Sequence, residues 1–416
     1  MYQVEKHIIT PNDPRWVVID HACFLSKNLY NAGLYEIRQH YFNTEKSLSY
    51  EDLDKKMHDN PDYCALPAKV SQQVLMQVCH NWHGFWAQLR AFHNHPEKFR
   101  GRPKLPRYKH KTQGRNLLVY TDQAVSKREL KKGVISPSQL GISVKSDITN
   151  LKQVRIIPQK THYVIEIVYT VEISLASPNP DRVASIDIGL NNLATVTTNQ
   201  PGISPLLVNG RPLKAINQLY NKQKAQLQSQ LPKGKHHSER IGVLTDKRNN
   251  RVNHYLHQAS HMIAQFLYHN GIGTLIIGKN NGWKQEIELG SVTNQNFVQI
   301  PHARFIAMLT YKATLLGIKV ILINENYTSK CSFLDDEPIQ KHKVYKGKRI
   351  HRGLFRASDG RVINADVNGA LNIMKKVIPN VTSDGIGACV VMPVRMTPFQ
   401  PKKKKSCHTI KQVVCT

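Results

Sequence analysis

The sequence predicts a multidomain α/β protein in which a small β-domain, interrupted by helices, precedes a larger domain of mixed strands and helices. Three observations support this fold class. Apolar residues recur at helical spacing between about residues 24 and 92, short strand-like runs follow as far as residue 171, and apolar runs alternate with polar helical segments beyond residue 180. The length of 416 residues fits two or three domains.

Two helices are expected in the first part of the chain, at about 24–41 and 68–92. The second carries an apolar stripe that steps by three and four residues, and it comprises Leu75, Val78, Trp82, Phe85, Leu89 and Phe92. We interpret the stripe as a buried seam against a neighbouring helix rather than as a platform for stacking bases. Strand-like runs follow at 117–120, 154–157 and 162–171. The prediction is a β-domain formed by 1–20 and 97–180, with a helical insert at 21–96.

The second half predicts a mixed sheet flanked by helices. Prolines at 178 and 180 break the preceding pattern, and we place the domain boundary there. Three strand-like runs indicate an antiparallel meander, and a later helical crossover joins two strands that must then be parallel. This is the order of an RNase H-like fold, assigned to 181–377, with a loosely ordered basic tail at 378–416. The expected elements are strands at 183–188, 193–198, 206–208, 274–277 and 319–323 and helices at about 213–230, 238–269, 301–316 and 365–377.

The charge balance indicates a polyanionic partner. Lys and Arg number 58 against 29 Asp and Glu, so the formal net charge is +29. No segment is long and apolar enough to span a membrane, and the N-terminus lacks the layout of a signal peptide. The seven cysteines form no close CxxC pair, which argues against a disulfide framework and for a reducing compartment.

The basic residues are clustered, which favours phosphate contact over a general role in solubility. One cluster lies at 100–115, where two prolines impose an extended course, a second lies at 341–356, and Lys402 to Lys405 form an unbroken run. The residues expected to bind nucleic acid from the first cluster are Arg102, Lys104, Arg107, Tyr108, Lys109, Lys111 and Arg115.

Two aspartates are candidates for metal binding. Asp187 lies in an apolar strand, where a carboxylate is costly unless a cation compensates it; a strand-end residue that caps a turn is the alternative. Asp366 lies at the start of a helix, where an aspartate often serves only as a cap or a partner of the helix dipole. The apolar face of the same helix would hold Asp366 over the end of the strand that carries Asp187.

Three segments resemble the RuvC blocks of the TnpB family. Members of this family are transposon-encoded, RNA-guided DNA endonucleases related to type V CRISPR effectors. The three segments are IDIGLNNLA at 186–194, YTSKCS at 327–332 and DVNGALNI at 366–373. The similarity extends upstream through 29–31 and 101–106 and so covers nearly the whole chain. It implies a barrel-like wedge domain with a helical recognition insert, followed by a RuvC nuclease domain.

One departure from the family pattern concerns an acid. Gly278 stands where the family has a glutamate at the end of a strand, so the third ligand must come from elsewhere. Glu325 follows the adjacent parallel strand, about 4.8 Å away, and we choose it over Glu286 and Glu288, which lie in a loop. The alternative is that Glu325 is an exposed loop acid and that the nuclease is crippled.

A second departure is the loss of the family's zinc ribbon. Cys331 remains alone, with His342 and His351 far from it in sequence, so zinc is not expected. The insert at 331–364 is basic instead, and we expect it to contact nucleic acid, although a solvated loop without contact is the alternative. The candidates here, together with one residue of the long basic helices, are Lys346, Lys348, Arg349, Arg352 and Arg248.

The resemblance implies an RNA-guided DNA endonuclease in which Asp187, Glu325 and Asp366 hold Mg²⁺, or Mn²⁺ in its place, and hydrolyse phosphodiesters next to a short flanking motif. Its partners would be a guide RNA and double-stranded target DNA, and a monomer in the prokaryotic cytoplasm, associated with the nucleoid, is favoured. Two alternatives remain open: a nuclease-inactive, RNA-guided repressor, and a protein-only transposase with an RNase H-like core.

Overall fold

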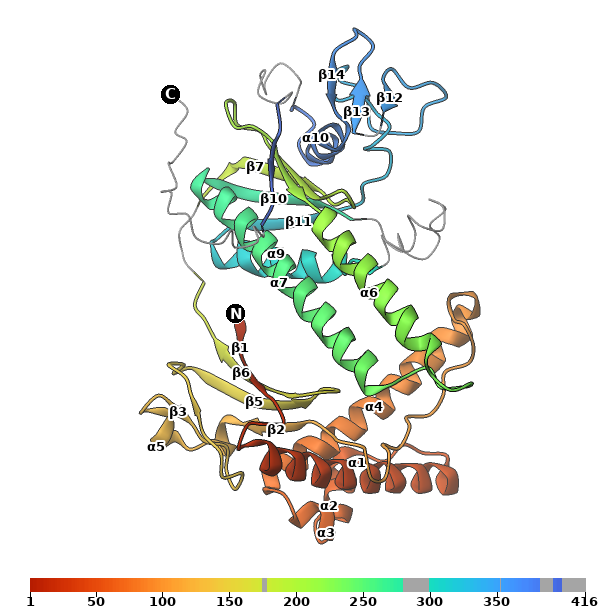
Figure 1. Cartoon of the computed structure of the whole chain (residues 1–416), viewed down its shortest axis with the longest axis vertical. Coiled ribbons are helices and arrows are strands. Elements are labelled where there is room, and N and C mark those ends of the chain that lie inside the picture. Colours follow the sequence, from red (N-terminus) through yellow and green to blue (C-terminus); the bar gives the residue numbers. More distant parts are fainter. Residues whose placement is uncertain (174–177, 280–298, 352, 382–391, 399–416) are drawn as a thin grey trace. The chain divides into compact units, whose positions relative to one another are not determined.

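The computed structural model describes residues 1–173, 178–279, 299–351, 353–381 and 392–398. The chain forms two compact units, Met1–Glu172 and Ile173–Thr416, whose elements are labelled in Figure 1. None of the helices in these ranges is both long and apolar enough to cross a membrane.

The N-terminal unit contains a four-stranded antiparallel sheet in the order β1-β6-β5-β2. The order is open, with β1 and β2 at its edges, so the barrel-like closure stays a prediction. The three expected strand-like runs all form strands of this sheet. The strands of the unit are β1 (Tyr2–Ile9), β2 (Leu118–Thr121), β5 (Leu151–Pro158) and β6 (Tyr163–Thr170), with a small hairpin of β3 (Val134–Ile135) and β4 (Val144–Lys145).

Helices separate β1 from β2 in the chain. The apolar stripe on α4 is buried at Leu75, Val78 and Trp82, as predicted, while its outer part from Phe85 onward is only half-buried. A Cβ at Gly33 would lie 2.9 Å from Cδ2 of Leu75, so a glycine permits the close packing of α1 on α4. The helical segment starts before the predicted position 21. Its elements are α1 (Trp16–Thr44), α2 (Tyr50–Met57), α3 (Pro61–Cys64), α4 (Ala68–Asn94) and η1 (Pro96–Lys98), and η2 (Asp122–Ala124) and α5 (Lys127–Leu130) follow β2.

The C-terminal unit is built on a six-stranded sheet in the order β11-β10-β7-β8-β9-β15. The meander β7-β8-β9 is antiparallel, and β10 and β11 are parallel to β7, which confirms the predicted order. Pro180 lies within β7 rather than in a linker. Its missing N–H costs no hydrogen bond to β8, because the ladder between β7 and β8 begins only at Ala184. The strands are β7 (Asn179–Asp187), β8 (Asn192–Thr198), β9 (Leu206–Asn209), β10 (Ile272–Gly278), β11 (Lys319–Ile323) and β15 (Val394–Met396).

The tail was expected to be loosely ordered, and this is wrong for β15. That strand pairs in parallel with β9, Val394 donates its backbone N–H to the Pro205 carbonyl at 2.8 Å, and Asn209 holds Thr397 at 3.0 Å. Sequence periodicity could not predict β15, because a strand of three residues is too short to show an alternating pattern and its pairing partner, β9, is distant in the chain.

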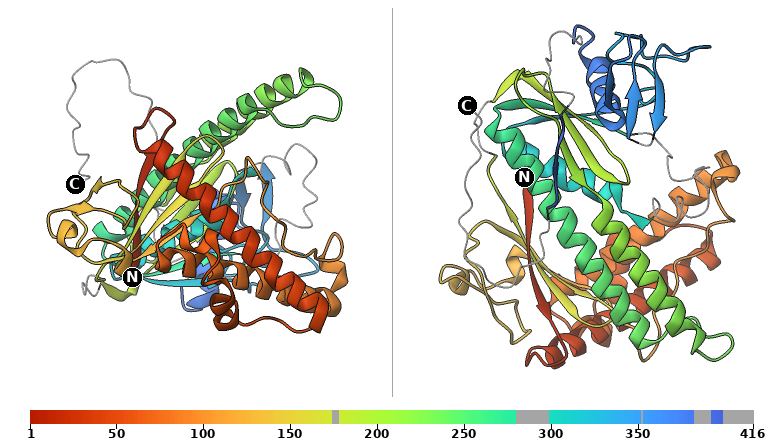
Figure 2. Two further views of the ribbon diagram at one scale, coloured as in Figure 1. Left: turned by 90° about the horizontal axis from the view of Figure 1, so that it is seen from below. Right: turned by 45° about the horizontal axis from the view of Figure 1, so that its top comes forward.

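Helices cover both faces of this sheet. The residues of α7 and α9 share one core cluster with Ile186 and Leu275, whereas Ile373 and Met374 of α10 pack on Val183 and Ile276 from the other face. The right-hand view of Figure 2 shows α10, in blue, beside the sheet. The helices are α6 (Arg211–Ser229), α7 (Glu239–His269), α9 (His302–Leu315) and α10 (Ala365–Val377).

The basic insert is a folded element rather than a loop. It forms a three-stranded antiparallel sheet of β12 (Lys348–His351), β13 (Leu354–Arg356) and β14 (Val362–Asn364). Phe355 and Ile363 of this sheet share a core cluster with Leu371 of α10. The insert is therefore attached to the helix that carries Asp366.

Candidate active site

Asp187 is the last residue of β7, between the buried Ile186 and Ile188. Its carboxylate faces the first half of α10. A Cβ at Gly369 would lie 2.8 Å from Oδ2 of Asp187, so this glycine leaves the room that the carboxylate occupies. The side chain of Ser185 is bonded to the Ala370 carbonyl of the same helix at 2.6 Å, which fixes the strand against α10.

Asp366 lies in the first turn of α10 but does not cap it. The cap is Asn364, whose Oδ1 accepts from the backbone N–H groups of Asp366 and Val367 at 3.0 and 3.2 Å. The carboxylate of Asp366 is thereby left for other partners. It accepts a bond from Asn192 Nδ2 at 2.8 Å and pairs with Arg349 Nη2 at 3.4 Å.

Glu325 follows β11, next to the end of β10. Gly278 pairs with Ile323 in the ladder between these strands, and a Cβ at Gly278 would lie 2.7 Å from Oε2 of Glu325. The carboxylate of Glu325 thus occupies the space that a side chain at position 278 would fill. Glu286 and Glu288 lie outside the described residues, so the choice of Glu325 among the three acids stays a prediction.

Glu325 and Asp366 both act electrostatically on Asp187. Burial raises the pKa of the Asp187 carboxyl well above its ordinary value, and the charges of Glu325 and Asp366 raise it further, while Arg349 opposes them. Burial also raises the pKa of Glu325, to about 7, against the effect of the Lys376 ammonium. Ionisation of Asp187 is therefore costly in this site, and a bound divalent cation would offset that cost.

The donor chemistry of this cluster fits a hard divalent cation, because all three groups offer carboxylate oxygens and two glycines leave space for them. Across the described ranges, no group of three or more His, Cys, Asp or Glu side chains is arranged to hold a metal ion as it stands. One Asp366 oxygen faces the Arg349 guanidinium at 3.4 Å. In the insert at 331–364, which stands where the family has a zinc ribbon, the Cys331 thiol is buried and its Sγ lies 3.6 Å from the Gln340 carbonyl oxygen.

The raised pKa values predict how stability depends on pH. An acid whose pKa is raised by folding binds its proton more tightly in the folded state, so its contribution to stability is lost as the pH rises from about 4.5 through about 7 for Glu325. The loss is on the order of 3 kcal/mol, since one pKa unit is worth about 1.4 kcal/mol. We expect the melting temperature in EDTA to fall more between pH 5 and pH 8 for the wild type than for Glu325→Gln, and Mg²⁺ to reduce that fall. If the melting temperatures of the wild type and Glu325→Gln depended equally on pH, the raised pKa of Glu325 would be contradicted.

The basic strip at 104–111 is held along α1 by its backbone. Lys27 donates to the Lys111 carbonyl at 2.7 Å, Asn31 binds both backbone groups of Lys109 at 2.8 and 2.9 Å, and Arg38 donates to the Pro106 carbonyl. Most of the strip's own side chains consequently face solvent. The exposed members of the predicted set are Arg102, Lys104, Arg107, Tyr108 and Lys111.

Lys109 and Arg115 of the predicted set are partly buried and have structural partners. Lys109 is half-buried, with Nζ 5.0 Å from the ring centre of Tyr30, and burial lowers its pKa. Arg115 forms a bidentate pair with Asp20 at 2.7 and 2.8 Å and also lies over Phe24. The hydrogen bonds of Arg115 are thus already used within the fold, which sequence clustering could not reveal.

This difference predicts two phenotypes. Lys104→Ala with Arg107→Ala should weaken nucleic-acid binding and reduce the slope of log K against log salt by about 1.4–1.8, at about 0.7–0.9 per phosphate contact. Arg115→Ala should instead lower the melting temperature and leave the slope unchanged, because it removes an ion pair of the fold. Titrations between 50 and 200 mM salt distinguish them, and an unchanged slope in the double variant would contradict phosphate contact.

The other predicted basic residues lie on the C-terminal unit. Arg248 of α7 is half-buried over the ring of Tyr220, with 4.9 Å to its centre, and Arg349 is bound to Asp366. Lys346 and Lys348 are exposed, whereas Arg352 and the lysine run at 402–405 lie outside the described residues.

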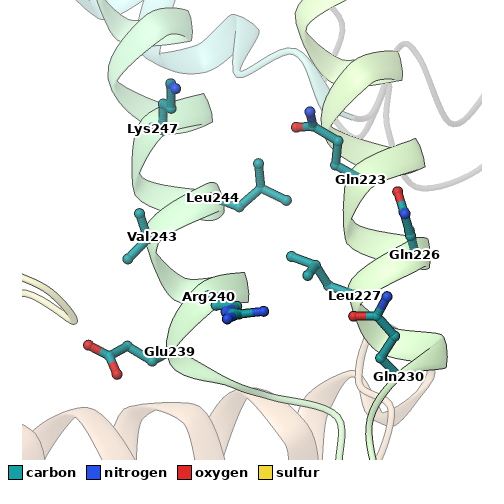
Figure 3. A pocket seen from close by; sticks show the side chains of 9 residues that line it. All are labelled: Gln223, Gln226, Leu227, Gln230, Glu239, Arg240, Val243, Leu244 and Lys247. Carbon is teal, nitrogen blue, oxygen red and sulfur yellow. The ribbon is translucent and has the colours of Figure 1, made fainter.

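A groove of about 650 Å³ lies between α6 and α7 (Figure 3). Leu227, Val243 and Leu244 form its apolar part, and Arg240 and Lys247 of α7 add positive charge. This surface combines cationic and apolar groups on the helix pair that includes Arg248.

Two family models match the chain. One, described as a probable transposase (OrfB_IS605), matches residues 166–284, and the other, the Cas12f1-like TNB domain, matches residues 302–373. Together these ranges contain all three acids. A TnpB-like protein of Acidianus two-tailed virus, ORF457, is 28% identical over 225 residues, which are 51% of this chain and 45% of that protein.

These matches support the predicted resemblance to the TnpB family. The CRISPR-associated endodeoxyribonuclease Cas12f2 of a Micrarchaeota archaeon is 25% identical over 236 residues, 53% of this chain and 41% of that protein. The chain therefore spans less than half the length of each of these two relatives. A solved structure of the mini-RNA-guided endonuclease CRISPR-Cas_phi3 aligns over 90% of this chain and 92% of its own, with 10% identity and a TM-score of 0.43.

Sequence reasoning missed the contacts that surround the acids of this chain, including the role of Arg349, which was predicted only as a nucleic-acid contact. Asn192 and Arg349 contact Asp366, and Lys376 acts on Glu325. A usable signal existed for Lys376, because it continues the four-residue spacing of Asn368 and Asn372 on an otherwise buried helix. Nothing local marked Arg349, which approaches from a separate sheet.

Proposed function

We propose that this protein is an RNA-guided, Mg²⁺-dependent DNA endonuclease encoded by a transposable element. The observation that supports the proposal is that Glu325 and Asp366 both act on the buried Asp187, at the end of β7, and raise its pKa. Two relatives add support, because one is named as a CRISPR-associated endodeoxyribonuclease and the other as TnpB-like.

In this proposal Asp187, Glu325 and Asp366 hold the metal ions. Bound Mg²⁺ would lower the pKa of the attacking water and neutralise the oxygen that leaves. The chain itself supplies orientation: Asn364 and Asn192 fix Asp366, and β7 fixes Asp187. Arg349, which is half-exposed, can exchange its contact with Asp366 for a phosphate of the substrate once a cation binds that carboxylate.

The two units take different parts. The antiparallel sheet and helices of the N-terminal unit would act as wedge and recognition insert, with the basic strip at 104–111 on phosphates. Sequence choice would come from pairing between guide RNA and DNA, while the protein binds the heteroduplex by shape and charge. The groove between α6 and α7 offers a further cationic surface for nucleic acid.

One observation favours a second candidate, an RNA-guided DNA-binding repressor that does not cut. Gly278 replaces the family's glutamate, and within the described part of the chain the acids are not arranged to hold an ion as they stand. The placement of Glu325 in the space beside Gly278 favours the nuclease.

A single experiment tests the proposal. The protein is purified with its co-expressed RNA and mixed with DNA that matches the guide, in Mg²⁺ or in EDTA, with and without prior ribonuclease treatment. We expect cleavage only with intact RNA and Mg²⁺. Guided binding without cleavage would support the repressor, and DNA binding that survives ribonuclease would support a protein-only transposase.

A further inference from the structure

Helix α10 presents a row of polar side chains to the segment that carries Glu325. Asn368, Asn372 and Lys376 are spaced by four residues and therefore lie on one face of the helix. Asn368 and Asn372 both donate to the Cys331 carbonyl, at 2.9 and 2.8 Å, and Asn372 also donates to the Thr328 carbonyl at 2.9 Å.

Lys376 completes this row at the catalytic end of the segment. Its Nζ donates to the carbonyl of Asn324 at 3.0 Å and to that of Asn326 at 2.8 Å, the residues on either side of Glu325. The Glu325 carbonyl itself accepts from the hydroxyl of Thr328 at 2.7 Å and from its N–H at 3.2 Å. The backbone around Glu325 is thus fixed from both sides.

The position of Glu325 explains why such bonds are needed. β11 is the edge strand of the sheet, and its last ladder bond runs from the Lys279 N–H to the Ile323 carbonyl at 2.8 Å. Beyond Ile323 the sheet no longer constrains the backbone, and the turn continues through Tyr327 at φ 67°. A glutamate at position 278 would have been fixed within the ladder of β10, whereas Glu325 depends on the helix.

We propose that Lys376 is a positioning residue that holds Glu325 at Asp187 by binding the two carbonyls that flank it. The inference rests on the proposed nuclease function. An ammonium suits this task, because it has three donors and no acceptor and can bind two carbonyls at once. Since α10 also carries Asp366 and contacts Asp187 through Gly369, one helix aligns all three acids.

The test compares Lys376→Met with Lys375→Met. Lys375 is the adjacent lysine of the same turn, and its Nζ binds Asp336 Oδ1 at 3.1 Å rather than the backbone beside Glu325. Amide hydrogen exchange in EDTA, on the full chain with its RNA, reports whether the turn at 324–328 is held. Mn²⁺ binding by electron paramagnetic resonance and cleavage against Mg²⁺ concentration report on the acids.

For Lys376→Met we expect faster exchange at Asn326 and Thr328, and metal affinity lowered about 10–100-fold, the usual effect of losing a residue that orients a ligand. Guided DNA binding should be unchanged. Lys375→Met should behave as the wild type, and Lys376→Arg should restore most of the protection and metal affinity.

Wild-type exchange and metal affinity in Lys376→Met would overturn the inference, as would equal defects in both methionine variants. If Lys376→Met does not fold, Lys376→Gln takes its place, and wild-type exchange at the turn with wild-type metal affinity in that variant would overturn the inference. Failure of the wild type to cleave guide-matched DNA would instead contradict the proposed function. Hydrogen exchange at the turn 324–328 would then still show whether Lys376 holds the backbone around Glu325.

Discussion

Asp187→Asn is expected to abolish DNA cleavage while leaving RNA-guided DNA binding intact. The substitution keeps the shape of the side chain but removes the charge that the other two acids and Arg349 surround. We expect the rate of cleavage to fall by at least about 10²–10³-fold, which is typical when one preorganised electrostatic group is lost. Single-turnover cleavage and filter binding with the same guide-matched DNA measure the two properties.

The control for this variant lies on the same strand. Asp181 is exposed on β7, so Asp181→Asn should cut at the wild-type rate. The metal-free Asp187→Asn protein should also melt at a higher temperature at pH 8, because a buried carboxylate with a raised pKa no longer has to ionise. Wild-type cleavage by Asp187→Asn would exclude this aspartate from the active site.

Glu325→Gln is expected to cause a loss of similar size. The carboxylate sits where the side chain of residue 278 would lie, so it takes the place of the acid that β10 lacks. Glu286→Gln and Glu288→Gln are the matched variants and should remain active. Full activity of Glu325→Gln, with loss in either of the other two, would show that the third acid comes from the loop.

Gly278→Ala tests whether the Glu325 carboxylate needs the space beside residue 278. Its Cβ would lie 2.5 Å from Cδ1 of Ile373 and 2.7 Å from Oε2 of Glu325, so the carboxylate must move. We expect reduced cleavage in the wild-type background and no further loss in Glu325→Gln. Additive losses would mean that the alanine acts only by disturbing the packing of α10.

Strands β8, β9 and β10 of the C-terminal unit could be predicted because they are buried along most of their length. Strand adjacency also predicted Glu325, since β10 and β11 are joined by a helical crossover and must be parallel. The position of Asp187 followed from the cost of a carboxylate among Ile186 and Ile188.

What could not be predicted depends on contacts between distant segments. The sequence predicted Arg349 and Arg115 as phosphate contacts. In the structure Arg349 of β12 pairs with Asp366, and Arg115 pairs with Asp20 of α1. The insert sheet was missed because its three strands are short, and two of its strands bury only Phe355 and Ile363. Packing against α10, rather than local propensity, stabilises it.

The most direct test of the account is a crystal structure of the RNA-bound protein soaked in Mn²⁺, with anomalous scattering used to locate the ions. We predict Mn²⁺ between the carboxylates of Asp187, Glu325 and Asp366, with the Arg349 guanidinium displaced from Asp366. Ions elsewhere, or an Asp187 that faces Glu286 or Glu288 while Glu325 points to solvent, would contradict it.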